Sequence, residues 1–400
     1  MNILIITPRI PYPPYRGDKL KIFNIAKILS QNNSVKILTF YRNSKQFDDL
    51  INFDKYGIKI TAVKLSVWES FFHALTAVFF NYPFQVAWFK SSKMKNEVEI
   101  ILNKEKFDVI YYHLIRSAQY LNLSVINHRQ LNVIDYTDAV SLYLNRFAEI
   151  EKNPIKRLFI KVEQKRVEKY EKIAEKFHTL FICSEIDKKF LQRKGMNAQI
   201  QILNNGVDVG YFNSTISKFE EKRIIFTGNM PYYANYDAAI YFVNDIFPEI
   251  IKSVPEAEFF IVGQKPPNKI KSLAGKNIFV TGFVKDIKAE YLKSAVNVAP
   301  MRFGAGTLNK VIESIALGVP VVASSIAVAG LPTKLNKYVF IADEPKKFAE
   351  TVVRIINNPN IRTDIMEEGK KVLTELLSWE KIVGQFETYL AGELSKVNKI

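Results

Sequence analysis

Ile3-Leu-Ile-Ile6 opens the chain as an uninterrupted apolar run, and Val35-Lys-Ile-Leu-Thr-Phe40 is a second one. Such runs are typical of parallel strands that are covered on both faces. Between them, a loop rich in Pro and Gly is followed by apolar residues at helical spacing over 20–29. Strand, loop, helix and strand in this order predict a βαβ unit that opens a doubly wound parallel sheet.

The same alternation continues along the chain and starts afresh after Lys222. Further strands are expected at 108–112, 131–135, 179–183, 224–228, 259–263, 278–282, 296–300 and 319–323, and helices at 154–177, 237–251 and 308–317. Four hundred residues also exceed what one hydrophobic core usually supports. We therefore predict an α/β fold with two Rossmann-like doubly wound domains that face a central cleft.

The domain boundaries follow from where the second series begins. We expect one domain over 1–210 and a second over 211–378, with the hinge near 205–220. Residues 379–400 are expected to form a helix that packs back on the first domain.

The composition excludes several classes of protein. Hydrophobic residues make up 48% and charged residues 24%, which is typical of a folded soluble protein. The single cysteine, Cys183, excludes a disulfide scaffold and a multi-thiolate metal site. We see no signal peptide and no apolar run of the roughly 20 residues that cross a bilayer. The sequence therefore predicts a cytoplasmic protein.

The net charge of +16 is distributed unevenly. Residues 1–200 hold 32 basic and 19 acidic residues, whereas residues 201–400 hold 24 and 21. A basic half indicates an anionic partner, such as nucleic acid, membrane lipid or a phosphorylated substrate. A basic surface that merely keeps the protein soluble is the alternative.

The clearest chemical signal is the segment 304–323, in which a loop with two glycines opens a helix. Free backbone N–H groups and the positive end of the helix dipole make such a start a site for phosphate oxygens. Lys310 adds a positive charge, and the carboxylate of Glu313 can accept hydrogen bonds from two ribose hydroxyls. An exposed ion pair between Lys310 and Glu313 is the alternative. The candidate ligand-binding residues of this segment are Gly304, Ala305, Gly306, Thr307, Asn309, Lys310 and Glu313.

Three preceding strands end in glycine, at Gly228, Gly263 and Gly282. Ligands of parallel α/β sheets bind beyond the carboxyl ends of the strands, and glycine lets the backbone approach a ligand closely. Phe283 beside Val284 is suited to cover one face of a base. The candidates from these strand ends are Gly228, Asn229, Gly263, Phe283 and Val284.

Taken together, these segments resemble the retaining GT-B glycosyltransferases of glycosyltransferase family 4. The resemblance rests on the Pro-rich loop with Gly17, Cys183-Ser-Glu185, Asn205-Gly-Val-Asp208, the glycine-ended strands, and Lys310-Val-Ile-Glu313 followed by Gly-Val-Pro-Val-Val. It extends over nearly all 400 residues. Within the family, Phe226-Thr-Gly-Asn-Met230 and Asn309-Lys-Val311 most resemble the sugar transferases of bacterial exopolysaccharide and exosortase-associated clusters.

The resemblance implies an enzyme that transfers a sugar from a UDP- or GDP-sugar with retention at the anomeric carbon, without a metal or another cofactor. By position, Glu313 is the second glutamate of the family's E-x7-E motif and holds the ribose. The first glutamate is replaced by Ala305, so its usual role has no counterpart at that position. Lys310 then carries the diphosphate, alone or with an N-domain group, and Arg302 is a second candidate.

In the first domain, the resemblance implies that Gly17 lies near the diphosphate. The family often has a histidine near the sugar after a strand in the middle of this domain, where this chain has Asp135 and Asp138. Either aspartate is a candidate for the sugar-contacting group. His113, after the preceding strand, is a weaker one, with a structural histidine as its alternative. The candidate catalytic residues are thus Lys310, Asp138 and His113.

Residues 68–89 are rich in Trp, Phe and Tyr and contain a single acidic residue, Glu69. An aromatic amphipathic segment in a basic domain is suited to a membrane interface, where it would meet a lipid-linked glycan acceptor. Together with the resemblance, which implies a role in surface polysaccharide synthesis, this predicts a protein at the inner face of the plasma membrane. An ordinary buried helix pair is the alternative. The helix over 156–176 mixes Lys and Glu, which indicates an exposed helix with i,i+4 pairs.

Two other functions remain as alternatives. Ala305 and the absence of the family's basic pair after its first donor-domain strand favour a catalytically degenerate binding or scaffold protein. The charge of +16 alone favours a nucleic-acid-binding protein, but we find no nucleic-acid-binding motif, so no nucleic acid is expected as a partner.

Overall fold

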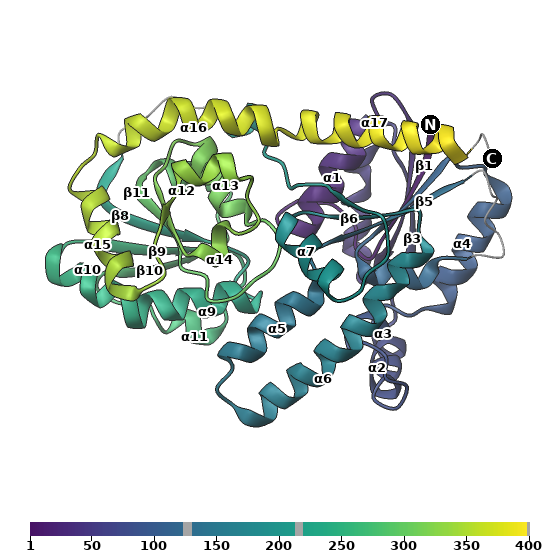
Figure 1. The fold of residues 1–400 in the computed structure, drawn as a ribbon, viewed down its shortest axis with the longest axis horizontal. Helices are drawn as coiled ribbons and strands as arrows, with labels where there is room; N and C mark the ends of the chain where they lie inside the picture. The colour runs from purple at the N-terminus through teal and green to yellow at the C-terminus, as the bar shows by residue number, and fades with distance from the viewer. Residues whose placement is uncertain (123–129, 213–218, 398–400) are drawn as a thin grey trace. The chain divides into compact units, whose positions relative to one another are not determined.

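The computed structural model describes residues 1–122, 130–212 and 219–397, and these form two α/β units (Figure 1). The first unit comprises Met1–Asn204 and Trp379–Ile400, and the second comprises Asn205–Ser378. Each unit is built on one sheet whose strands pair in parallel. The predicted α/β class with two doubly wound sheets is confirmed. Part of the predicted hinge, residues 213–218, lies outside the described residues.

The first unit has a seven-stranded sheet in the order β3-β2-β1-β4-β5-β6-β7. The strands are β1 (Asn2–Thr7), β2 (Ser34–Tyr41), β3 (Lys59–Lys64), β4 (Val109–His113), β5 (Leu131–Thr137), β6 (Thr179–Ile182) and β7 (Ile200–Ile202). Ile5 of β1 lies opposite Ile37 of β2 on one side and Tyr111 of β4 on the other. The apolar run 3–6 is fully buried, as a central strand covered on both faces must be.

The first unit also contains α-helices. They are α1 (Gly17–Leu29), α2 (Val67–Thr76), α3 (Phe84–Ala87), α4 (Ser92–Lys104), α5 (Val140–Ile150), α6 (Pro154–Glu171), α7 (Glu185–Arg193) and α17 (Trp379–Val397). The last helix, α17, packs against α1 within the first unit (Figure 1). Its Phe386 contacts the rings of Tyr111 and Phe181 edge-on, at centroid distances of 5.6 and 5.0 Å.

The second unit has a six-stranded sheet in the order β10-β9-β8-β11-β12-β13. Its strands are β8 (Glu220–Thr227), β9 (Glu258–Val262), β10 (Ile278–Gly282), β11 (Ser294–Ala299), β12 (Val321–Ala323) and β13 (Phe340–Ile341). Its helices are α8 (Val209–Phe212), α9 (Tyr233–Tyr241), α10 (Phe247–Ser253), α11 (Asn268–Lys271), α12 (Ile287–Leu292), α13 (Asn309–Ala316), α14 (Ser325–Val328), α15 (Pro345–Ile356) and α16 (Ile361–Leu377). A π-helical turn, Phe242–Ile246, joins α9 to α10. None of the described helices of either unit combines the length and the apolar content needed to cross a membrane.

Candidate functional site

The glycine-ended strands of the second unit pack tightly at their carboxyl ends. The backbone N–H of Gly228 donates to Val262 O at 3.0 Å, and that of Gly263 donates to Gly282 O at 3.1 Å. A Cβ placed on Gly263 would lie 1.7 Å from Gly228 O, so this position admits no side chain without a backbone shift. Gly263 is therefore explained by the packing of one strand end on the next, whereas a Cβ on Gly228 would lie 2.8 Å from the side chain of Asn235.

The loop before α13 is fixed by a second close approach. Gly306 has a φ of +73°, and a Cβ on Gly330 would lie 2.1 Å from Gly306 O. Thr307 Oγ1 donates to Gly330 O at 3.0 Å. By contrast, a Cβ on Gly304 would meet nothing within 4 Å. Leu308, at the N-cap position, supplies no side-chain hydrogen bond to the start of the helix, so this end of α13 is open to an anionic ligand.

Lys310 lies in the first turn of α13, and its side chain is buried. Its Nζ donates to Asn235 Oδ1 at 2.8 Å and lies 3.9 Å from the centroid of the Phe226 ring. Burial lowers the pKa of Lys310 to about 7, although Glu313 opposes the shift. The alternative of an exposed ion pair with Glu313 is wrong, because Lys310 is not exposed and its hydrogen bond goes to α9.

Glu313 lies one turn further along α13 and is half-buried. It accepts a hydrogen bond from the Tyr291 hydroxyl at 3.1 Å, and the same hydroxyl lies 2.6 Å from Thr227 Oγ1. Burial raises the pKa of Glu313, while Tyr291 and Lys310 act in the opposite direction. Tyr291 thus links the end of β8 to the carboxylate that we expected to hold a ribose. It was missed in the sequence, because nothing in its local pattern distinguishes it from a core tyrosine.

Arg302, the second diphosphate candidate, is held by a carboxylate. Its guanidinium pairs with both oxygens of Asp237 on α9 and lies 5.0 Å from the centroid of the Tyr241 ring. Ala305 contributes no polar side-chain group where the family's first glutamate would stand. Phe283 follows Gly282, whose φ is +71°, and has half of its surface exposed. Its ring is therefore accessible to a ligand.

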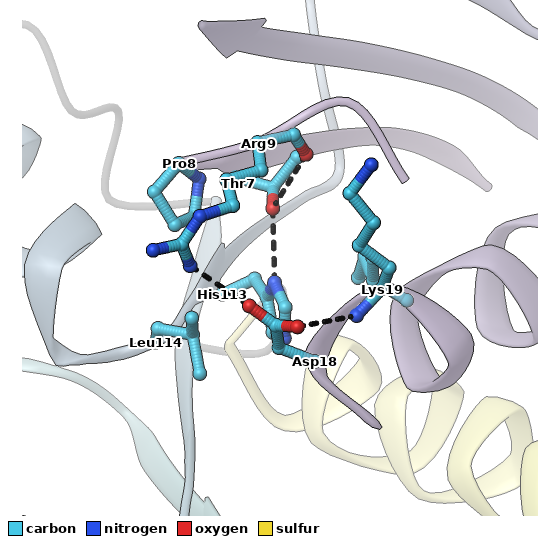
Figure 2. Close-up of a pocket in the computed structure, with 8 residues that line it drawn as sticks. Thr7, Pro8, Arg9, Asp18, Lys19, His113 and Leu114 are labelled. Carbon is cyan, nitrogen blue, oxygen red and sulfur yellow. Dashed lines mark hydrogen bonds and ion pairs between the residues drawn. The ribbon is translucent and has the colours of Figure 1, made fainter. Parts of the chain in front are cut away.

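In the first unit, polar side chains gather in a pocket where β1 and β4 end and α1 begins (Figure 2). The pocket is lined by Thr7, Pro8, Arg9, Asp18, Lys19, Ile22, His113 and Leu114. Asp18 accepts from Arg9 Nη1 at 2.8 Å and from Arg16 Nε at 3.1 Å. Although burial opposes it, these two arginines hold the pKa of Asp18 below its usual value. Gly17 is the first residue of α1, beside this cluster.

His113 is buried and has a satisfied Nδ1. The Thr7 hydroxyl lies 2.9 Å from His113 Nδ1 (Figure 2), whereas Nε2 has no hydrogen-bond partner among the residues that the structure describes. Burial lowers the pKa of His113 to about 4, so the ring is neutral at physiological pH. It can therefore take part in a hydrogen bond, but it does not supply positive charge.

The two candidate aspartates after β5 have different environments. Asp135 is fully buried, forms an ion pair with Lys21 Nζ at 2.8 Å, and accepts hydrogen bonds from Tyr111 OH and Thr137 N. These partners leave it no free position for a sugar. Thr137, which donates one of these hydrogen bonds, has a φ of +64°, a strained backbone conformation for a β-branched residue. Of the two aspartates, only Asp138 remains available.

Asp138 is half-buried and accepts a hydrogen bond from Cys183 Sγ at 3.3 Å. Burial, followed by repulsion from Asp187, raises the pKa of Asp138 to about 7. Asp187 is itself fixed at the start of α7, where it accepts from Ala139 N at 3.1 Å and bonds Ser184. A carboxyl group that titrates near neutral pH is suited to donate a hydrogen bond to a substrate hydroxyl or to accept one from it. Within the described ranges, no group of three or more His, Cys, Asp and Glu side chains is arranged to hold a metal ion.

Comparisons with known proteins show what this chain is similar to. Residues 221–358, within the second unit, match the model of the family "Glycosyl transferases group 1". The chain is 23% identical over 376 residues to an uncharacterised 44.6 kDa protein in the cps region of Klebsiella pneumoniae, covering 89% of this chain and 91% of that protein.

Among solved structures, the chain resembles Anabaena Alr3699/HepE in complex with UDP, with a TM-score of 0.66 at 13% identity over 98% of this chain and 100% of that one. It also resembles sucrose-phosphate synthase from Thermosynechococcus elongatus, with a TM-score of 0.71 at 15% identity over 99% and 100% of the two chains. The chain therefore has the GT-B fold of glycosyltransferases, and residues 221–358 of its second unit match the model of the glycosyl transferases group 1.

Proposed function

We propose that this protein is a retaining glycosyltransferase of family 4 that transfers a sugar from a UDP- or GDP-sugar to a lipid-linked glycan in bacterial surface polysaccharide biosynthesis. The observation that carries the proposal is the arrangement at the start of α13. Buried Lys310 and half-buried Glu313 lie one turn apart beside the end of β8, and Gly263 at the next strand end admits no side chain without a backbone shift. The match of 221–358 to the glycosyl transferases group 1 supports the same function.

The chemistry that we assign to the second unit is leaving-group stabilisation. When the bond between the sugar and the diphosphate breaks, negative charge develops on the leaving oxygen, and fixed donors stabilise it without reorganisation. Lys310 and the amides at the start of α13 would supply those donors, and Glu313 would accept hydrogen bonds from the ribose. The HepE structures with UDP and with UDP-glucose show that this fold accommodates such donors in that protein.

Residues of the first unit would act on the sugar and the acceptor. We assign contact with the transferred sugar to Asp138, whose carboxyl group titrates near neutral pH, with His113 as a neutral hydrogen-bonding group. We propose transfer with retention at the anomeric carbon and without a metal or another cofactor. The acceptor would be bound at the inner face of the plasma membrane, and the cps region in the name of the K. pneumoniae relative supports a role in polysaccharide synthesis.

The test is a transfer assay with the full chain, a panel of UDP- and GDP-sugars, and lipid extract as acceptor. We expect release of nucleoside diphosphate from at least one donor and its loss in Lys310→Met. Donor binding without turnover by any lipid or glycan acceptor would favour the degenerate binding protein instead. Binding of no sugar nucleotide at all would overturn the proposal.

A further inference from the structure

The first unit exposes an unusually large set of apolar side chains on two neighbouring segments. We call this set the apolar patch. It comprises Val67, Trp68, Phe71, Phe72, Leu75, Val78, Phe79 and Phe80 of α2 and the turn after it, and Ile155, Leu158, Phe159 and Val162 of α6. Trp68, Phe79, Phe80 and Ile155 are each 78% exposed or more. Twelve of the twenty large hydrophobic residues described as exposed belong to it. Patches of this kind mark interaction surfaces.

The structure also corrects two sequence expectations. Residues 68–80 are not part of an ordinary buried helix pair, because most of their large side chains are exposed. The first half of α6 is not simply a charged helix with i,i+4 pairs, because four apolar residues spaced at i, i+3, i+4 and i+7 lie exposed along it.

Four contacts join the turn after α2 and the start of α3 to α6. The rings of Phe84 and Phe159 stack at 5.4 Å with an interplanar angle of 17°. Phe84 N donates to Glu163 Oε1 at 2.8 Å, and Arg166 Nη2 donates to Val78 O at 3.0 Å. The hydroxyls of Tyr82 and Tyr170 lie 3.3 Å apart. The turn after α2 and the start of α3 are thus held against α6, and α2 itself contacts α3.

The exposed charges on α6 beside the apolar patch are basic, and one of them, Lys156, pairs with Glu151 just before the helix. Lys156, Arg157, Lys161 and Lys165 are exposed on α6, among its apolar positions. The carboxylate within this stretch, Glu163, is turned inward, where it is buried against Phe84 and Arg166. On the other segment, Glu69 is the single acidic residue between 65 and 89. The exposed charge that flanks the apolar side chains on α6 is therefore basic.

We propose that the apolar patch docks this protein on a bilayer of anionic lipids, with α2 and the turn after it inserted among the headgroups and α6 lying along the surface. Aromatic side chains partition into the headgroup region, and neighbouring Lys and Arg attract anionic lipid. A second copy of the chain is a poorer occupant, because its own lysines would face those of the first. The proposal rests on the proposed function only for the location of the acceptor; binding to the bilayer depends on this surface alone.

Flotation with vesicles tests the proposal on the full chain. Vesicles of phosphatidylcholine alone are compared with vesicles that contain phosphatidylglycerol as well. We expect binding to the anionic vesicles, and a loss of about tenfold or more in binding for the triple variant Trp68→Ser, Phe79→Ser, Phe80→Ser. The control replaces exposed apolar residues elsewhere in the first unit, Phe47→Ser with Ile51→Ser, and should bind like the wild type. Equal loss in the control would overturn the proposal.

The contribution of the basic residues of α6 is tested separately, with a matched set of charge reversals as the control. Lys156→Glu, Arg157→Glu and Lys161→Glu together should abolish the preference for anionic vesicles, whereas Lys269→Glu, Lys271→Glu and Lys276→Glu in the second unit should retain it. Insertion is read from Trp68, because brominated lipid should quench its fluorescence in the wild type and much less in Trp68→Phe.

Three outcomes would contradict docking on a bilayer: no vesicle binding by the wild type, binding that the triple aromatic variant retains, or a wild-type dimer that this variant dissociates. Sugar-nucleotide binding is measured without vesicles. Vesicle binding without sugar-nucleotide binding would therefore contradict the proposed function but not docking on the bilayer.

Discussion

Lys310 Nζ donates its hydrogen bond to Asn235 Oδ1 at 2.8 Å, on another helix, and does not pair with Glu313 one turn along its own helix. A neutral amide and the face of Phe226 stabilise an ammonium group less than a carboxylate does, so burial lowers the pKa of Lys310 to about 7. A diphosphate would provide the negative charge that Asn235 lacks. The proposed role of Lys310 therefore predicts that this residue lowers the stability of the fold while it favours donor binding, and both effects can be measured.

Lys310→Met should raise stability and abolish donor binding. A lysine whose pKa is lowered in the folded state destabilises the fold at pH values below that pKa, and this penalty fades as the pH rises towards the ordinary value of 10.5. We expect the variant to be more stable than the wild type by about 1–3 kcal/mol near pH 7, and the difference to vanish near pH 10. Urea denaturation at both pH values measures it. A destabilised variant at neutral pH would contradict this account.

Donor affinity should fall as the pH rises above about 7. In the free protein Lys310 loses its proton there, whereas a bound diphosphate keeps it charged, so binding is coupled to proton uptake. Calorimetric titrations near pH 8 in two buffers of different ionisation enthalpy would measure uptake of up to about one proton. Lys310→Met should show no uptake at this site. A donor affinity that is constant across this pH range would exclude Lys310 from diphosphate binding.

Glu313→Gln should weaken nucleotide binding by about tenfold to a hundredfold, because an amide accepts hydrogen bonds from ribose hydroxyls less strongly than a carboxylate does. Tyr291→Phe removes the hydroxyl that links Glu313 to Thr227, and a smaller loss is expected because the carboxylate remains. Comparing the affinity for UDP with that for inorganic pyrophosphate, which has no ribose, distinguishes the loss of a ribose contact from the loss of a phosphate contact. Unchanged UDP affinity in Glu313→Gln would sink the ribose assignment.

Replacement by alanine should strongly destabilise the protein at one glycine of the second unit and leave its stability almost unchanged at another. Gly263→Ala places a Cβ 1.7 Å from Gly228 O, so we expect a loss of about 3 kcal/mol or more of stability. Gly304→Ala places its Cβ in open space, so stability should change by less than about 0.5 kcal/mol. If the donor lies against this loop, Gly304→Ala should still weaken its binding. Thermal melting and donor titration of both variants check the pair.

Asp138→Asn should lower the rate of transfer by about a hundredfold while leaving UDP affinity unchanged, because the carboxyl group is assigned to the sugar and not to the nucleotide. The wild-type rate should show an apparent pKa near 7 that the variant lacks, since the pKa of Asp138 is raised to about 7. Cys183→Ser, which retains a donor to the same carboxylate, is the control. If Asp138→Asn transferred the sugar at the wild-type rate, the assignment to Asp138 would be wrong and His113 would be the remaining candidate.

Much of the fold could be predicted from the sequence, because buried parallel strands such as 3–6 and 224–227 are written as uninterrupted apolar runs. Local pattern also placed Lys310 and Glu313 at the start of one helix. It could not reveal that Lys310 would bond Asn235, or that Tyr291 would reach Glu313, because these contacts join residues 75 and 22 positions apart. Nor could it distinguish Asp138 from Asp135, since the difference is made by Lys21 on α1, which is distant in the sequence. The exposure of Phe79 and Ile155 likewise depends on which neighbours are present in three dimensions.

Calorimetric titration of the wild type and Lys310→Met with a panel of UDP- and GDP-sugars tests the central claim most directly. The account predicts that at least one sugar nucleotide binds the wild type with a Kd of about 1 µM to 1 mM, and that Lys310→Met, although folded and more stable, loses this binding by about a hundredfold or more. Equal affinity in the two proteins, or no binding of any sugar nucleotide to the wild type, would contradict it.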